Sequence, residues 1–174
     1  DNDHGNETLD PHVWLSTINA KVIVRAVADK LIKLDPANKT HYATNRMQVL
    51  ADLEKLERDL RTDLKSVGKI PYVALHDAFQ YFEHQFDLSP LGALSSAAGT
   101  SPGARRVSEL RKGMARHKVH CIVSDPFARS AWIRSLGDGR EVRVAALDPL
   151  GTDIKAGPDH YVTMMRHNTA ALAS

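Results

Sequence analysis

The chain has 174 residues, of which 43% are hydrophobic and 25% are charged, enough for one compact domain, or one lobe with an attached piece, around a real core. The formal net charge is +2, and Lys and Arg are interspersed with Asp and Glu, which argues against a nucleic-acid partner. No apolar stretch approaches the roughly 20 residues of a membrane-crossing helix, and the single cysteine, Cys121, excludes an internal disulfide and a Cys-rich zinc module.

The first ten residues are polar and turn-prone, with neither an initiator Met nor a targeting pattern, so we expect an irregular segment that starts within a longer protein. Ser16 is then a suitable N-cap for a helix over residues 17–34. Apolar residues recur there at close to helical spacing and predict an amphipathic helix with a wide buried face. They are Ile18, Val22, Ile23, Ala26, Val27, Leu31 and Leu34. Pro36 cannot continue this helix but suits the first turn of the next one.

A second helix is predicted over residues 36–66, where apolar residues again form one stripe and charged residues fill the other faces. The stripe consists of Tyr42, Val49, Leu50, Leu53, Leu56, Leu60, Leu64 and Val67. A helix of this length would extend about 45 Å, beyond the ~30 Å of a small domain, so part of it should project or brace a second body. A kinked pair of shorter helices is the alternative, although the segment has no internal proline or glycine.

After Gly68 the pattern changes to short apolar runs that alternate with helical stretches. The predicted strands cover residues 70–75, 86–93, 119–124 and 142–147, and the predicted helices cover residues 101–117, 127–136 and 158–172. Pro90 and Gly92 make the second strand an edge or irregular strand. The alternation predicts an α/β fold, with a mostly parallel four-stranded sheet flanked by helices in one lobe over residues 68–174.

Three of the four predicted strands end at a residue that could bind a metal: His76, Asp125 and Asp148. Because the carboxyl ends of parallel strands share one edge of the sheet, these side chains could converge there. One imidazole and two carboxylates suit a divalent metal, and imidazole favours zinc over calcium or magnesium. Each residue also has a structural alternative. His76 could simply be hydrogen-bonded at its strand end, and Asp125 and Asp148 precede prolines and could form turns.

Motifs of common enzyme classes are absent from the sequence. It contains no G-x-S-x-G elbow, no H-E-x-x-H zinc helix, no G-x-G-x-x-G fingerprint and no P-loop. A zinc-dependent hydrolase would need an open coordination position and a general base, and no motif assigns the second role to any residue. We therefore expect a protein that is not an enzyme and has no catalytic residues.

Five motifs occur in a distinctive order and spacing: DPHVWL from Asp10, DPAN from Asp35, HDAFQYF from His76, SPGARR from Ser101 and LDPLG from Leu147. With these motifs the chain resembles, over essentially its whole length, the periplasmic zinc-binding proteins of bacterial ABC-type zinc uptake systems. Those proteins form part of the metal-binding cluster of solute-binding proteins. The resemblance implies two α/β lobes joined by one long rigid helix, with the metal held between the lobes.

The resemblance also implies how the chain is divided. Residues 1–16 would be the remnant of a His-rich loop, which includes His4, followed by the DPHVW ligand motif. Residues 17–35 would be the last helix of an N-terminal lobe, residues 36–67 the connector helix and residues 68–174 the C-terminal lobe. The sheet of the N-terminal lobe would lie outside this chain.

In the family that the chain resembles, three histidines are the main zinc ligands. By motif, His12 and His76 match two of them, and the third would lie in the missing N-terminal lobe. Histidine at position 76, where manganese-selective relatives have a carboxylate, favours zinc. Asp148 matches a position that is a ligand in some relatives and is replaced in others, so it is a further candidate. Asp125 matches a position near the site and is expected to bind the other ring nitrogen of a ligand histidine.

The function that the resemblance implies is that of a carrier, which binds Zn²⁺ in the periplasm and delivers it to the membrane permease of an ABC transporter for zinc uptake. Because zinc binds neutral imidazoles, affinity should fall as the pH drops through the ordinary histidine range at about pH 6.5. For this chain alone we expect weak metal binding, since one histidine and one wall of the cleft are absent. Manganese or broad-specificity metal binding, an adhesin role and a zinc-dependent hydrolase are the alternatives.

Cys121 matches, in the same resemblance, a cysteine that pairs with another one near the C-terminus. That partner would lie beyond Ser174, so Cys121 either forms this disulfide in the whole protein or is a buried free thiol. A periplasmic location would permit the disulfide.

Overall fold

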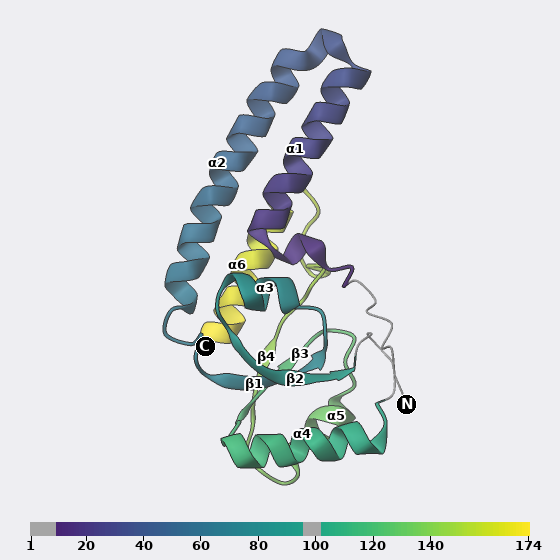
Figure 1. The fold of residues 1–174 in the computed structure, drawn as a ribbon, viewed down its shortest axis with the longest axis vertical. Coiled ribbons are helices and arrows are strands. Elements are labelled where there is room, and N and C mark those ends of the chain that lie inside the picture. The colour runs from purple at the N-terminus through teal and green to yellow at the C-terminus, as the bar shows by residue number, and fades with distance from the viewer. Residues whose placement is uncertain (1–9, 96–101) are drawn as a thin grey trace, which may run out of the picture.

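The computed structural model describes residues 10–95 and 102–174, so His4 and the predicted irregular segment before Asp10 lie outside the described residues. Its centre is a four-stranded parallel sheet with the strand order β2-β1-β3-β4 (Figure 1). The strands are β1 (Pro71–His76), β2 (Ser89–Ser95), β3 (Cys121–Ser124) and β4 (Arg143–Ala146). This arrangement confirms the predicted α/β fold with a parallel sheet flanked by helices.

The helices cover both faces of the sheet (Figure 1). They are η1 (Val13–Leu15), α1 (Thr17–Leu34), η2 (Pro36–Asn38), α2 (Lys39–Leu64), α3 (Gln80–Gln85), α4 (Ala104–His117), α5 (Ser130–Gly137) and α6 (His160–Ala173). Within the described part of the chain, none of these helices has both the length and the apolar character that crossing a bilayer requires.

The side chains of β1 alternate between two hydrophobic cores, one on each face of the sheet. Tyr72 and Ala74 belong to the core that the sheet shares with α2, α3 and α6. Val73 and Leu75 belong to the core under α4 and α5. By the same alternation, His76 at the end of β1 lies on the face covered by α3 and α6.

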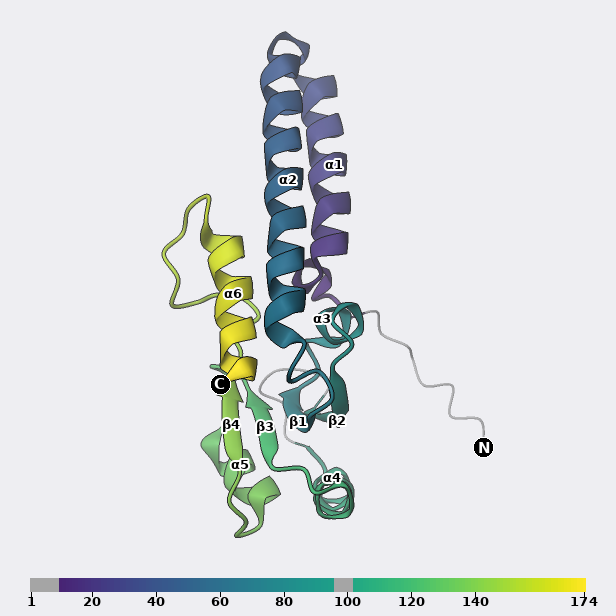
Figure 2. The same ribbon diagram turned by 90° about the vertical axis from the view of Figure 1, so that its left-hand side faces the viewer.

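Helices α1 and α2 form an antiparallel hairpin that projects beyond the sheet (Figures 1 and 2). They are joined by η2, where Pro36 occupies the first turn as predicted. α2 is one continuous helix of 26 residues rather than a pair of shorter ones, and its length is about 39 Å. Its carboxyl-terminal half alone is buried, through Leu53, Leu56, Leu60 and Leu64.

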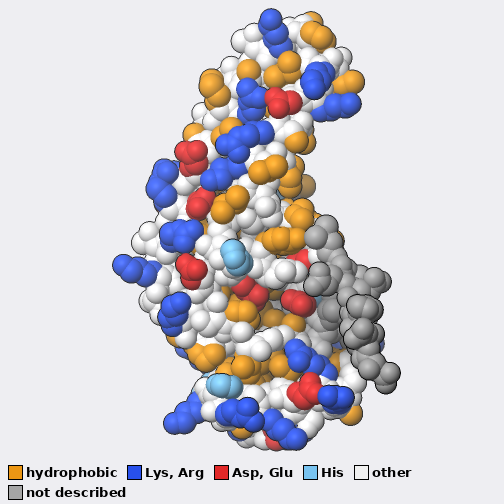
Figure 3. All heavy atoms as spheres, in the orientation of Figure 1, with side chains coloured by type: hydrophobic (Ala, Val, Ile, Leu, Met, Phe, Trp, Pro, Cys, Tyr) orange, Lys and Arg blue, Asp and Glu red, His pale blue; other side chains and the backbone are white. Residues whose placement is uncertain are grey.

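The helix over residues 17–34 has the predicted bounds, but the prediction that it has a wide buried face is wrong for the described structure. Only Thr17, Ala20 and Ala28 of α1 are buried. The reason is that α2 covers one side of α1 and α3 meets only its first turn, so hydrophobic side chains lie exposed along the hairpin (Figure 3). The exposed side chains, called the α1 stripe below, are Ile18, Val22, Ile23, Val27, Leu31 and Leu34.

Most element boundaries differ from the prediction by one to three residues, and two of these differences have a visible cause in the backbone. β2 begins at Ser89 rather than at Phe86, because Phe86 follows α3 as its C-cap and Asp87 has a left-handed backbone conformation (φ 54°) that interrupts an extended chain. The helix predicted from residue 101 begins at Ala104, after an extended Gly103.

Candidate metal centre

His76 is the last residue of β1 and is 8% exposed. Its Nδ1 lies 3.0 Å from Oδ2 of Asp125, which directly follows the adjacent strand β3. The other oxygen of Asp125 accepts a 2.8 Å hydrogen bond from the backbone N–H of Phe127, so the carboxylate is fixed by its own turn. Neighbouring parallel strands therefore bring His76 and Asp125 together at one edge of the sheet.

His12 immediately precedes η1, and its ring is held by Asp10. Oδ1 of Asp10 lies 2.6 Å from Nδ1 of His12 and also accepts a 2.9 Å hydrogen bond from the backbone N–H of His12. Oδ2 of Asp10 is buried and has no hydrogen-bond partner among the described residues. The motif analysis missed this role of Asp10. The signal that could have shown it is the spacing, because an Asp side chain commonly binds the backbone two residues further on.

The rings of His12 and His76 lie close together, with centroids 5.1 Å apart and planes at 77°. Each Nδ1 faces a carboxylate, which only accepts hydrogen bonds when it is ionised, so each neutral ring carries its proton on Nδ1. Nε2 of each ring then has a free lone pair. Histidines that bind metals usually have this arrangement, with one nitrogen for the metal and the other donating to a carboxylate.

Long-range hydrogen bonds hold the segment that carries His12 against the sheet domain. The hydroxyl of Tyr81, on α3, donates to the carbonyl of Asp10 at 3.2 Å. The hydroxyl of Tyr161, on α6, donates to the carbonyl of Trp14 at 2.8 Å. Helices α3 and α6 therefore set the position of this segment relative to the sheet.

Asp148 follows β4, but its carboxylate is used within its own turn. Oδ1 accepts a 2.9 Å hydrogen bond from the backbone N–H of Leu150, and Oδ2 accepts bonds of 2.5 and 2.6 Å from the N–H and the hydroxyl of Thr152. Burial alone would raise the pKa of Asp148, but the hydrogen bonds outweigh burial and hold the pKa below its ordinary value. This geometry supports the turn alternative for Asp148.

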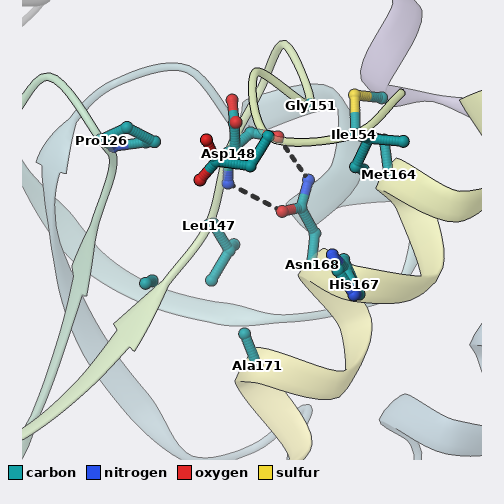
Figure 4. Close-up of a pocket in the computed structure, with 11 residues that line it drawn as sticks. Pro126, Leu147, Asp148, Gly151, Ile154, Met164, His167, Asn168 and Ala171 are labelled. Atoms are coloured by element: carbon teal, nitrogen blue, oxygen red, sulfur yellow. Dashed lines mark hydrogen bonds between the residues drawn. The ribbon is translucent and has the colours of Figure 1, made fainter. Parts of the chain in front are cut away.

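Figure 4 shows Asp148 at a cavity of about 350 Å³ between β4 and α6. The buried side chain of Asn168 accepts a 2.8 Å hydrogen bond from the N–H of Asp148 and donates a 2.9 Å bond to its carbonyl. Within residues 10–95 and 102–174, no three His, Cys, Asp or Glu side chains are grouped so that they could hold a metal ion. The structure thus brings His12 and His76 together and does not group Asp148 with them.

The sequence model of one protein family, described as "ZnuA: Zinc-uptake complex component A periplasmic", matches residues 1–174. The chain is 36% identical over 163 residues to the "High-affinity zinc uptake system protein ZnuA" of Yersinia pestis, a match that covers 94% of the chain and 51% of that protein. It is 31% identical over 158 residues to the protein of the same name from Brucella abortus (strain 2308), and this match covers 91% of the chain and 47% of that relative. The chain therefore spans about half the length of these curated relatives.

Solved structures have the same fold. A crystal structure of ZnuA matches with a TM-score of 0.82 at 21% identity, over 99% of this chain and 62% of that one. A mutant structure of the laminin-binding adhesin Lmb from Streptococcus agalactiae matches with a TM-score of 0.82 at 24% identity, over 97% and 64% of the two chains. A zinc-bound 138-173 deletion mutant of ZnuA matches with a TM-score of 0.79 at 22% identity, over 96% and 61%. At these identities the likeness concerns the fold alone.

Proposed function

The chain belongs to the ZnuA family of periplasmic zinc-uptake components, and from this we propose that it forms part of a carrier that binds Zn²⁺ in the periplasm and delivers it to the membrane permease of an ABC transporter. The relatives carry the names of zinc uptake proteins rather than of enzymes. The observation that carries the proposal is the pair of rings of His12 and His76, 5.1 Å apart, each with its Nδ1 on a carboxylate.

In this proposal Nε2 of His12 and Nε2 of His76 bind the metal. Asp10 and Asp125 fix the orientation of the two rings through the bonds at Nδ1. Manganese favours oxygen ligands, whereas imidazole suits zinc, so the histidine pair supports zinc over the manganese alternative. Asp148 is not among the proposed ligands, because its own turn already satisfies the carboxylate.

Two imidazoles are fewer than the three or four protein ligands of a zinc site. We therefore propose that an N-terminal lobe outside this chain supplies a third histidine, that residues 17–35 belong to that lobe, and that residues 36–67 connect it to the lobe of residues 68–174. Three side chains of the α1 stripe, Ile23, Val27 and Leu31, line an apolar groove of about 340 Å³ between α1 and α2 together with Val49. This groove supports the proposal, because soluble proteins seldom leave a contiguous apolar surface uncovered.

The test is the Zn²⁺ affinity of the whole protein with His12→Ala or His76→Ala, measured by competition with a chromophoric chelator. Loss of a ligand should cost more than the ~10- to 100-fold that follows loss of a ligand's outer partner. His117→Ala is the matched control, because this exposed histidine at the end of α4 lies away from the site and should leave the affinity unchanged. Wild-type affinity in either histidine variant would refute the proposed site.

A further inference from the structure

A set of buried polar side chains, called the Gln85 network below, links the segment that carries His12 to helices α3 and α2. The hydroxyl of Ser16 donates to Oε1 of Gln85 at 2.8 Å, and Nε2 of Gln85 donates to Oγ1 of Thr17 at 2.5 Å. The hydroxyl of Thr17 donates in turn to Oε2 of Glu57, on α2, at 3.3 Å. Ser16, Thr17 and Gln85 are all buried, so water does not compete for the bonds between them.

The direction of each bond in the Gln85 network follows from Glu57. Nζ of Lys21 donates to Oε2 of Glu57 at 2.8 Å, and this bond is the main reason that the pKa of Glu57 is lowered, which keeps the carboxylate ionised. An ionised carboxylate only accepts, so Thr17 donates to it, and the oxygen of Thr17 accepts from the amide of Gln85. Oε1 of Gln85 is then left to accept from Ser16, which also caps α1.

Helix α3 binds the same segment at a second point. Tyr81 donates to the carbonyl of Asp10, and Tyr81 and Gln85 lie one turn apart on the same face of α3. The two side chains therefore hold the chain on either side of His12, Tyr81 at the carbonyl of Asp10 and Gln85 at the side chains of Ser16 and Thr17. Because α3 follows β1 closely in the chain, it connects the positions of His12 and His76.

We propose that Gln85 is a positioning residue of the metal centre, which fixes His12 relative to His76 without touching the metal. This inference rests on the proposed function, since it concerns the geometry of the same site. An amide suits the task because its donor and its acceptor must both find partners, which permits one placement of the segment, whereas an apolar contact would allow it to slide. The backbone carbonyl of Gln85 accepts a 3.0 Å bond from Arg61, so the end of α3 is itself held by α2.

The test measures the Zn²⁺ affinity of the whole protein with Gln85→Met, which keeps the length of the side chain and removes its donor and acceptor. We expect a loss of about 10-fold, at the low end of the effects seen when the outer partner of a metal ligand is removed. Thr17→Val, which keeps the volume and removes the hydroxyl, should lower the affinity in the same direction. Leu136→Ala is the control, because it loosens the core under α5 and should leave the affinity unchanged. Thermal unfolding of each variant checks that it is folded at the temperature of the titration.

A double-mutant cycle separates positioning from a general loosening of the protein. In the His12→Ala background, Gln85→Met should change the affinity by less than about 2-fold, because the ring that it positions is absent. Wild-type affinity in Gln85→Met overturns the inference, and so does an equal loss with and without the His12 ring. If His12→Ala itself keeps the wild-type affinity, His12 is not a ligand, and the proposed site fails together with the inference. If Gln85→Met keeps the wild-type affinity while His12→Ala and His76→Ala lose it, the inference fails and the proposed site stands.

Discussion

The rings of His12 and His76 lie edge to face with their centroids 5.1 Å apart, and each is held through Nδ1 by a carboxylate of its own. The two carboxylates reach the site by different routes. Asp10 is in a local turn with His12, whereas Asp125 comes from the end of the strand beside β1. Each carboxylate can therefore be altered without disturbing the other.

Asp125→Asn should lower the Zn²⁺ affinity by about 10- to 100-fold. Asparagine keeps the shape of the side chain, but its NH₂ group can donate toward Nδ1 of His76. That bond favours the tautomer with the proton on Nε2, where the metal would bind. Competitive titration of the whole protein measures the effect, with the exposed change Asp138→Asn as the control. Equal affinities of the two variants would show that His76 does not need a carboxylate.

Asp148→Asn should leave the Zn²⁺ affinity close to that of the wild type but lower the free energy of unfolding by about 1–2 kcal/mol. The reason is that the carboxylate of Asp148 accepts hydrogen bonds from Leu150 and Thr152, which an amide replaces only in part. Urea denaturation and competitive titration of the same preparation measure the two effects. An affinity loss as large as that of His76→Ala would instead identify Asp148 as a ligand.

The stability contributed by Glu83 should depend on pH. Burial raises the pKa of Glu83 above its ordinary value of 4.5, and the 2.7 Å hydrogen bond from Tyr72 opposes this shift only in part. A carboxyl group with a raised pKa in the folded state contributes stability that is fully present below the pKa of the unfolded chain and is lost as the pH rises through the folded-state pKa. Glu83→Gln, which cannot ionise and can still accept from Tyr72, should therefore become more stable relative to the wild type as the pH rises from acidic to neutral.

Urea denaturation of both proteins at several pH values measures the change that Glu83→Gln causes. The difference in the free energy of unfolding should increase in favour of the variant with rising pH. A difference that is constant across this range would show that Glu83 ionises as easily in the folded protein as in the unfolded chain.

Val22→Asp tests whether another lobe covers the α1 stripe in the whole protein. In the described structure Val22 is 58% exposed, and Ile70, before β1, is 52% exposed. An unpaired charge that becomes buried destabilises a protein by several kcal/mol, whereas a surface substitution changes stability by about 0.5 kcal/mol or less. We expect Val22→Asp to destabilise the whole protein by at least about 2 kcal/mol, and the matched change Ile70→Asp to have little effect. Similar small effects of both changes, in thermal unfolding, would show that the stripe stays exposed.

The sequence pattern of apolar runs ending in polar residues could locate only the part of the site at the strand ends. His76 and Asp125 each close an apolar run, and parallel pairing alone is enough to bring such ends to one edge of the sheet. Asp148 has the same pattern, yet its carboxylate folds back onto Thr152. Which way a side chain points after a strand depends on the backbone angles of the following turn, and residue types alone do not specify them.

Other features had weaker signals or none. The periodicity of residues 17–34 predicted a helix with the observed bounds, but a periodic apolar face does not reveal what covers it. Asp10 precedes a proline and has the appearance of an ordinary turn residue in the sequence. Gln85 is a single buried amide on a helix of six residues, and its partners lie far away in the chain, so no local pattern could have identified it.

The burial of only one half of α2 has a mechanical consequence. Its carboxyl-terminal half packs into the core of the sheet domain through Leu53, Leu56, Leu60 and Leu64. Its amino-terminal half extends away from the sheet beside α1 (Figure 2). Over a helix of about 39 Å, a rotation of about 5° at the buried end would move the tip by roughly 3 Å. Metal–ligand distances tolerate deviations of only about 0.2 Å. The packing of the buried half of α2 therefore sets how accurately a lobe bound to the α1–α2 hairpin would be oriented relative to the sheet domain.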